Sequence, residues 1–129
     1  MADDAYILGL KTLKEVDGEA GEKVISSLKD ICPDLGTMIV EFGFGKVISR
    51  PGLDLRSREI ATVAALTALG NARPQLMVHI NGMLNVGCTR KEVVETVLQM
   101  AVYAGFPAAL NGMFAVQEVF AQRDSKGMS

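Results

Sequence analysis

The chain has 129 residues and a nearly balanced charge, with 13 Lys and Arg side chains against 15 Asp and Glu side chains. It has no basic stripe with interleaved aromatic residues, which argues against a nucleic-acid partner. Hydrophobic residues make up 49% of the chain, and one domain over residues 1–129 is long enough to bury a core. Because a small monomer has little interior for so many apolar side chains, we expect a homo-oligomer.

The N-terminal segment and the cysteines bear on the cellular compartment. The first residues, MADDAYILGLKTL, are acidic where a signal peptide would be basic. The uncharged stretch of strong helical character over residues 60–71 is too short to cross a bilayer. Cys32 and Cys88 are far apart and form no CxxC motif, as expected for two reduced thiols. We therefore expect a soluble, cytoplasmic protein with no membrane partner.

Helix start and stop signals are dense in the first half of the chain, whereas strand signals are nearly absent. Gly18 closes a first helix, and Pro33 with Asp34 beside it suits the first turn of a third helix. That third helix has apolar residues three or four positions apart along one face, namely Leu35, Met38, Ile39 and Phe42. The predicted helices of this half are residues 4–16, 21–31 and 33–48.

A break at SRPGLDL separates the second half, in which residues 60–70 read IATVAALTALG. This stretch is apolar or small around nearly its whole circumference, which predicts a helix buried on all sides. Pro74 begins the next helix, Gly87 is its C-cap, and Thr89 with Glu92 forms a capping box. The last residues, RDSKGMS, are expected to fray. The predicted helices here are residues 55–70, 74–87, 90–103 and 107–122. The fold class is all-α, with about seven antiparallel helices joined by short loops.

The only histidine, His79, lies in the helix predicted over residues 74–87. On a helical wheel it falls at the edge of an apolar stripe, beside Gln75 and Gly82. A glycine within a helix costs about 1 kcal/mol relative to alanine, and it leaves room for a ligand. Two interpretations stay open. His79 is either a core histidine with a backbone partner or a residue that moves a proton in a site. The stripe consists of Leu76, Met77, Ile80, Met83 and Leu84.

A polar cluster surrounds the entrance to the helix of residues 55–70. It is either a solvated first turn or an anion site, because an arginine can bind a carboxylate through two hydrogen bonds. One histidine and two scattered cysteines make no ligand cluster, so no metal is expected. The cluster consists of Arg50, Arg56, Arg58 and Glu59.

Three stretches carry a resemblance to a known family: FGKVISRPGLDLRSREIATVAALTALG, QLMVHINGMLNVGCTRKEVVE and YAGFPAALNGMFAVQEVF. Together, over about residues 43–120, they resemble the carboxymuconolactone decarboxylase family of the alkyl hydroperoxidase D-like superfamily. The resemblance implies a helical bundle of the alkyl hydroperoxidase D-like type, with its core at about residues 30–122. It also implies trimers or hexamers.

The resemblance further implies a lyase that needs no cofactor. Its substrate would be a small carboxylated lactone such as 4-carboxymuconolactone, which loses CO2 to give 3-oxoadipate enol-lactone during the breakdown of aromatic compounds. By resemblance, His79 donates a proton or stabilises the oxyanion, and Glu59 takes part in acid/base chemistry. Arg50 and Arg58 would bind carboxylates, with Gln75 beside the histidine.

Gln75 and the dipeptide Arg58-Glu59 depart from the decarboxylase pattern. The decarboxylases carry an acidic residue four positions before the histidine, where this chain has Gln75. They also tend to lack the acid after the arginine, which broader superfamily members have. Glu59 therefore becomes the candidate acid/base group in place of Gln75.

Two other functions stay open within the same fold. Peroxidase-type members carry CxxCxxxH, and their cysteine positions correspond here to Ala72 and Gln75, so a disulfide-based peroxidase is disfavoured. An oxidoreductase that relies on Cys88 or Cys32 is the first alternative. A non-catalytic oligomeric binding protein is the second.

Overall fold

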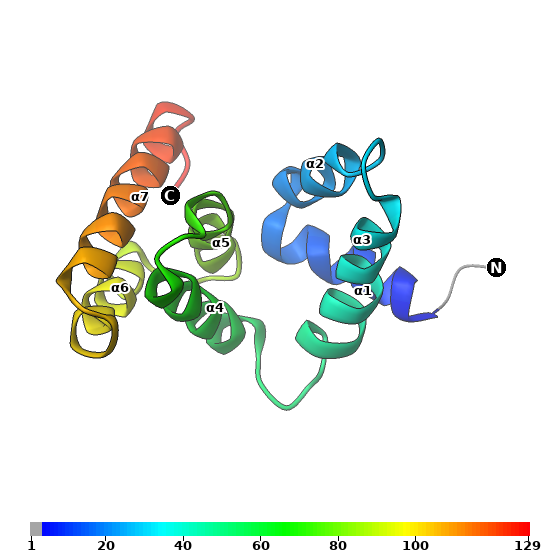
Figure 1. Ribbon diagram of the computed structural model, residues 1–129, viewed down its shortest axis with the longest axis horizontal. Coiled ribbons are helices and arrows are strands. Elements are labelled where there is room, and N and C mark those ends of the chain that lie inside the picture. The colour runs from blue at the N-terminus through cyan, green and yellow to red at the C-terminus, as the bar shows by residue number, and fades with distance from the viewer. Residues whose placement is uncertain (1–3) are drawn as a thin grey trace. The chain divides into compact units, whose positions relative to one another are not determined.

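The computed structural model describes residues 4–129, and every regular element within that range is helical. It contains seven α-helices and one π-helix, with no strand among residues 4–129, so the all-α prediction is confirmed. The chain divides into two compact units, residues 1–55 and 56–129 (Figure 1). The prediction of a single domain over residues 1–129 stays a prediction. No helix within residues 4–129 is long and apolar enough to cross a membrane.

The first unit contains four helical elements, coloured blue to cyan-green in Figure 1. The helix predicted over residues 33–48 is divided into a short α-helix and a ten-residue π-helix. In a π-helix each N–H bonds to the carbonyl five residues earlier, and such segments are rarely longer than one turn. The elements are α1 (Asp4–Asp17), α2 (Glu19–Ser27), α3 (Pro33–Met38) and η1 (Ile39–Ile48).

Two glycines allow α1 and η1 to pack backbone against backbone. A Cβ atom at Gly9 would lie 2.0 Å from the carbonyl oxygen of Val40, and one at Gly45 would lie 2.0 Å from that of Ala5. Real Cβ atoms do not approach so closely. The crossing of these two helices therefore requires glycine on both sides.

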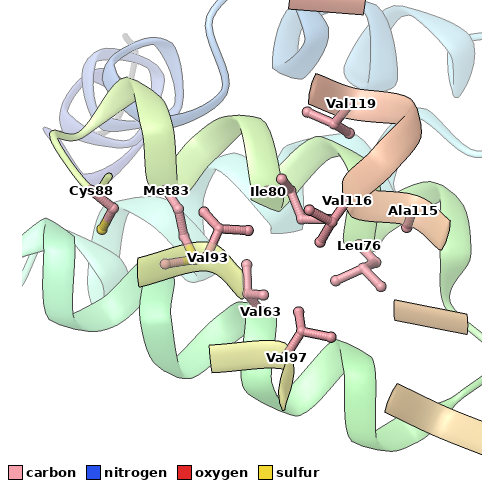
Figure 2. Packing of buried hydrophobic residues seen from close by; sticks show 10 residues of the cluster. All are labelled: Val63, Leu76, Ile80, Met83, Cys88, Val93, Val97, Ala115, Val116 and Val119. Carbon is pink, nitrogen blue, oxygen red and sulfur yellow. The ribbon is translucent and has the colours of Figure 1, made fainter. Parts of the chain in front are cut away.

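The second unit contains α4 (Leu55–Leu69, which begins at the boundary residue), α5 (Arg73–Asn85), α6 (Arg90–Ala104) and α7 (Phe106–Ser125). Helices α6 and α7 pack along each other, joined by Gly105 alone. All four helices contribute to one apolar core, which Figure 2 shows. Its buried members are Val63, Leu76, Ile80, Met83, Cys88, Val93, Val97, Ala115, Val116 and Val119.

Two helix ends confirm their sequence signals. Gly87 follows α5 with φ +101°, and its N–H bonds to the carbonyl of Leu84 at 3.3 Å. The Cys88 N–H bonds to the carbonyl of Met83 at 2.9 Å, which completes a Schellman motif. The capping box of α6 is also present, with Thr89 and Glu92 bonded reciprocally.

Two expectations were wrong. Helix α4 is not buried on all sides, because only Glu59, Val63 and Thr67 are buried along it. Its alanines are small and expose little apolar surface, so they do not require cover on every face. The C-terminal segment does not fray after residue 122. Helix α7 continues to Ser125, and the Met128 N–H bonds to the carbonyl of Arg123 at 2.8 Å.

The glycine contact of η1 gives a first prediction. Replacing Gly45 with Ala should lower the free energy of unfolding by about 3 kcal/mol, because the new methyl group meets a backbone oxygen that has no space to move. Gly43 lies in the same helix, and a Cβ there meets nothing within 4 Å. Gly43→Ala should therefore leave stability unchanged or raise it by up to about 1 kcal/mol. Urea denaturation followed by circular dichroism compares the two variants, and equal stabilities would contradict the prediction.

Candidate active site

Glu59 is an acidic side chain on the buried face of α4. Residues 59, 63 and 67 are spaced by four and therefore share one face of the helix. Glu59 is only 1% exposed, and Val63 and Thr67 above it are equally inaccessible. Thr67 satisfies its own hydroxyl by donating to the carbonyl of Val63 at 2.8 Å. Glu59 is thus the only carboxylate on a face that is otherwise apolar or internally satisfied.

His79 of α5 meets this carboxylate. Its side chain is 19% exposed and lies beside the buried stripe of Leu76, Ile80 and Met83. The Nδ1 atom of His79 lies 2.7 Å from Oε1 of Glu59. When Glu59 is ionised it can only accept, so Nδ1 carries the proton of this contact. This carboxylate–histidine contact is what a general acid/base requires for orientation.

The second oxygen of Glu59 is also buried. Within residues 4–129, Oε2 of Glu59 has no hydrogen-bond partner. A buried acceptor without a partner is costly, and native proteins keep such groups mainly where they serve chemistry. The carboxylate therefore has one oxygen that orients the imidazole and one that is not committed to a structural bond.

The remaining residues of the predicted site have different positions. Arg58 precedes Glu59 on α4, is partly buried, and its carbonyl accepts a hydrogen bond from Thr62 at 2.9 Å. Gln75 is exposed in the first turn of α5, one helical turn before His79. Arg50 lies in the first unit, exposed after η1, and lines a cavity of about 280 Å³ there. Of the five predicted residues, the second unit therefore brings Glu59 and His79 into direct contact.

Arg56 has a role that the sequence did not reveal. Its Nη2 lies 2.5 Å from Oε2 of Glu92, which joins the start of α4 to the start of α6. The hydrogen bond from Arg56, together with that from the Thr89 backbone, holds the pKa of Glu92 below its usual value. The capping box predicts the position of Glu92, because Thr89 is only three residues away. Arg56, the partner of Glu92 on α4, is 36 residues away, and no local sequence pattern indicates this pair. Arg56 therefore links α4 to α6 through a partly exposed ion pair.

The second unit also has a cavity of about 650 Å³ between α4 and α6, which Phe106 borders. It is lined by Ile60 of α4 and by residues of α6 that include Glu92 and Val102. Most of its wall is apolar side chain. A small organic ligand would fit within this volume.

The thiols are not arranged for disulfide chemistry within the second unit. Cys88 is the only cysteine of residues 56–129, and it is buried in the apolar core. Buried thiols in apolar surroundings are generally inert. Cys32 is exposed and belongs to the first unit.

The second unit thus places the single histidine of the chain against a buried glutamate, a contact of the kind that general acid/base groups use. The sequence of this chain was also compared with known protein families. Residues 33–118 match the carboxymuconolactone decarboxylase family, and the chain belongs to it. This match confirms the resemblance seen in the sequence.

Three relatives cover most of the chain. It is 36% identical to the 4-carboxymuconolactone decarboxylase of Acinetobacter baylyi over 92% of this chain and 88% of the relative. It is 33% identical to the nitrosuccinic acid decarboxylase of Metarhizium robertsii over 92% of this chain and 83% of that protein. It is also 33% identical to an uncharacterized 15.0 kDa protein of Paracoccus denitrificans, over 88% and 81% of the two chains. Two of these names support a decarboxylase, which is a carboxy-lyase.

The Glu59–His79 contact predicts where the imidazole carries a proton. The His79 ring should carry a proton on Nδ1, because the Glu59 carboxylate accepts there. Glu59→Ala removes this acceptor and should weaken the preference for a proton on Nδ1. Long-range ¹⁵N NMR of the imidazole measures this directly, since His79 is the only histidine of the chain. A ring signal that does not change between the two proteins would contradict the assignment.

Proposed function

We propose that this protein is a cofactor-free decarboxylase of a small carboxylated substrate, with His79 as the general acid. The observation that carries the proposal is the 2.7 Å contact between Nδ1 of His79 and the buried carboxylate of Glu59. That contact holds the imidazole in one orientation. Family membership and the names of two relatives support the same reaction class.

The substrates named for the two relatives share one chemical property. In 4-carboxymuconolactone, the electrons left by CO2 spread through the unsaturated lactone to its carbonyl oxygen. In nitrosuccinic acid, they spread into the nitro group. Each substrate contains its own electron sink and a second carboxylate. We therefore propose a substrate with two carboxylates, one of them attached to a carbon conjugated with an oxygen-containing acceptor.

The proposed reaction needs one proton. The bond between the carboxylate carbon and the substrate breaks, CO2 leaves, and the electron pair moves into the sink. The imidazolium of His79 then gives its Nε2 proton to the substrate carbon and becomes neutral, with Nδ1 still bonded to Glu59. The negative charge of Glu59 stabilises the imidazolium before transfer. Arg58 is the proposed partner of a substrate carboxylate, with Gln75 as a neutral hydrogen-bonding group one helical turn before His79. The carboxylate-binding role expected of Arg50, which lies in the first unit, stays a prediction.

Carbon dioxide release tests the function. Purified protein should release CO2 from 4-carboxymuconolactone or from nitrosuccinic acid, and His79→Gln should lower kcat by about 10²–10⁴-fold. Glu59→Gln should lower kcat as well, because it removes the charge that supports the imidazolium. Gln117→Ala, an exposed change on α7, is the matched control and should leave the rate unchanged. Release that persists in His79→Gln would contradict the role of His79.

The two alternative functions predict other results. An oxidoreductase that depends on thiols would reduce hydroperoxides and would lose that activity in Cys32→Ser or Cys88→Ser. A binding protein would take up either acid without converting it. Either result in place of CO2 release would displace the decarboxylase proposal.

We also propose that the protein is a homo-oligomer, as expected from its composition, with trimers or hexamers as the family resemblance implies. Three large apolar side chains at the turn between α6 and α7 are strongly exposed: Val102 at 76%, Tyr103 at 80% and Phe106 at 75%. Exposed apolar groups gathered in this way are typical of subunit contacts.

Charge introduced at this turn tests the association. Val102→Glu combined with Phe106→Glu should shift the molar mass in multi-angle light scattering toward that of one chain, because burying two carboxylates is costly. Ile31→Glu is the control, since Ile31 is 81% exposed but lies in the first unit. A wild-type protein that is already monomeric would disprove the proposal.

A further inference from the structure

A buried arginine on the far side of α5 is not used by the proposed reaction. Arg123 of α7 is only 7% exposed. Its Nη1 donates to Oδ1 of Asn81 at 2.9 Å and to Oδ1 of Asn85 at 3.3 Å. Its Nε donates to the carbonyl of Ser129 at 3.0 Å. The two partners on α5 are neutral amide oxygens, so no charge on α5 accounts for the contact between Arg123 and this helix.

Such an arrangement is expensive for stability alone. Burial lowers the pKa of Arg123, and the nearby charge of Arg90 lowers it further. Taking a guanidinium out of water costs free energy that an apolar side chain of similar size would avoid. The N–H groups of a planar guanidinium point in fixed directions. Nη1 of Arg123 donates to Asn81 and Asn85, which lie one helical turn apart on α5, so these bonds require a defined orientation of that helix.

The position of those acceptors relative to His79 is informative. At 100° per residue, His79 lies roughly 70° to one side of the centre of the buried α5 stripe. Asn81 and Asn85 lie roughly 130° and 170° to the other side. Helix α5 is therefore held from two directions, by Glu59 of α4 through His79 and by Arg123 of α7 through the two asparagines.

We propose that Arg123 is a positioning residue for His79, because it fixes the rotation of α5 about its own axis. Side chains extend roughly 5–6 Å from a helix axis, so a turn of roughly 10° moves the imidazole by about 1 Å. A contact of 2.7 Å would then exceed hydrogen-bond distance. The importance of this contact for catalysis rests on the proposed function. The positioning itself is a property of the folded protein and is measured without a substrate.

The chain offers a matched pair of variants. Arg73 of α5 also joins α5 to α7, through an ion pair of 2.6 Å with Glu118, but both side chains are 48% exposed. Arg123→Met removes the buried contact, and Arg73→Met removes the exposed one. A role in stability alone would lower the melting temperature without changing His79 well below that temperature.

The experiment is ¹H–¹⁵N NMR of the single imidazole at a temperature where each variant is fully folded. Arg123→Met should lose the hydrogen-bonded Nδ1–H resonance and shift both ring nitrogens toward the values of a ring exchanging between tautomers. Arg73→Met should keep the wild-type signals. His79 signals in folded Arg123→Met that match the wild type would overturn the proposal, as would an equal change in Arg73→Met.

A second variant covers the case in which Arg123→Met does not fold. Asn81→Ala removes the shorter of the two bonds to α5 and leaves Asn85 and the Ser129 carbonyl as partners of the guanidinium. It should weaken the Nδ1–H resonance in the same direction, and an unchanged resonance would overturn the proposal. If the wild-type protein releases no CO2 from any tested acid, the proposed function fails. The NMR result still decides the role of Arg123.

Discussion

The interaction on which the site depends is the hydrogen bond between a buried carboxylate and a partly exposed imidazole. Glu59 is fully enclosed, and one of its oxygens has no partner among the described residues. Burial of this kind lowers stability, and it is tolerated because the other oxygen orients His79. The result is a histidine whose Nδ1 is held in place by a buried carboxylate of a neighbouring helix.

Helix α5 links that bond to the rest of the second unit. Its apolar stripe packs into the core with α7, and its polar residues on either side of the stripe contact two different helices. The Schellman motif at Gly87 ends the helix at a defined residue. Precise placement of His79 therefore comes from three sources: the core, the carboxylate of α4 and the guanidinium of α7.

Local sequence signals predicted where the helices begin and end, but they did not predict how the helices pack against one another. Pro33, Gly87 and the pair Thr89 and Glu92 mark helix ends because caps involve residues only a few positions apart. The π-helix over residues 39–48 was missed, since it accompanies a backbone contact between Gly9 and Gly45 that joins distant parts of the chain. The apolar pattern of α4 overestimates its burial, because several of its apolar residues are alanines that need little contact with other helices.

The sequence by itself determined the all-α class, the family and the place of His79 at the edge of an apolar stripe. These follow from helical periodicity and from motifs that are contiguous in the chain. Only the tertiary structure decided which polar residues are partners. Glu59 and His79 are 20 positions apart, and Arg56 and Glu92 are 36 apart. A sequence pattern shows that two such side chains exist, but the packing of helices determines whether they meet.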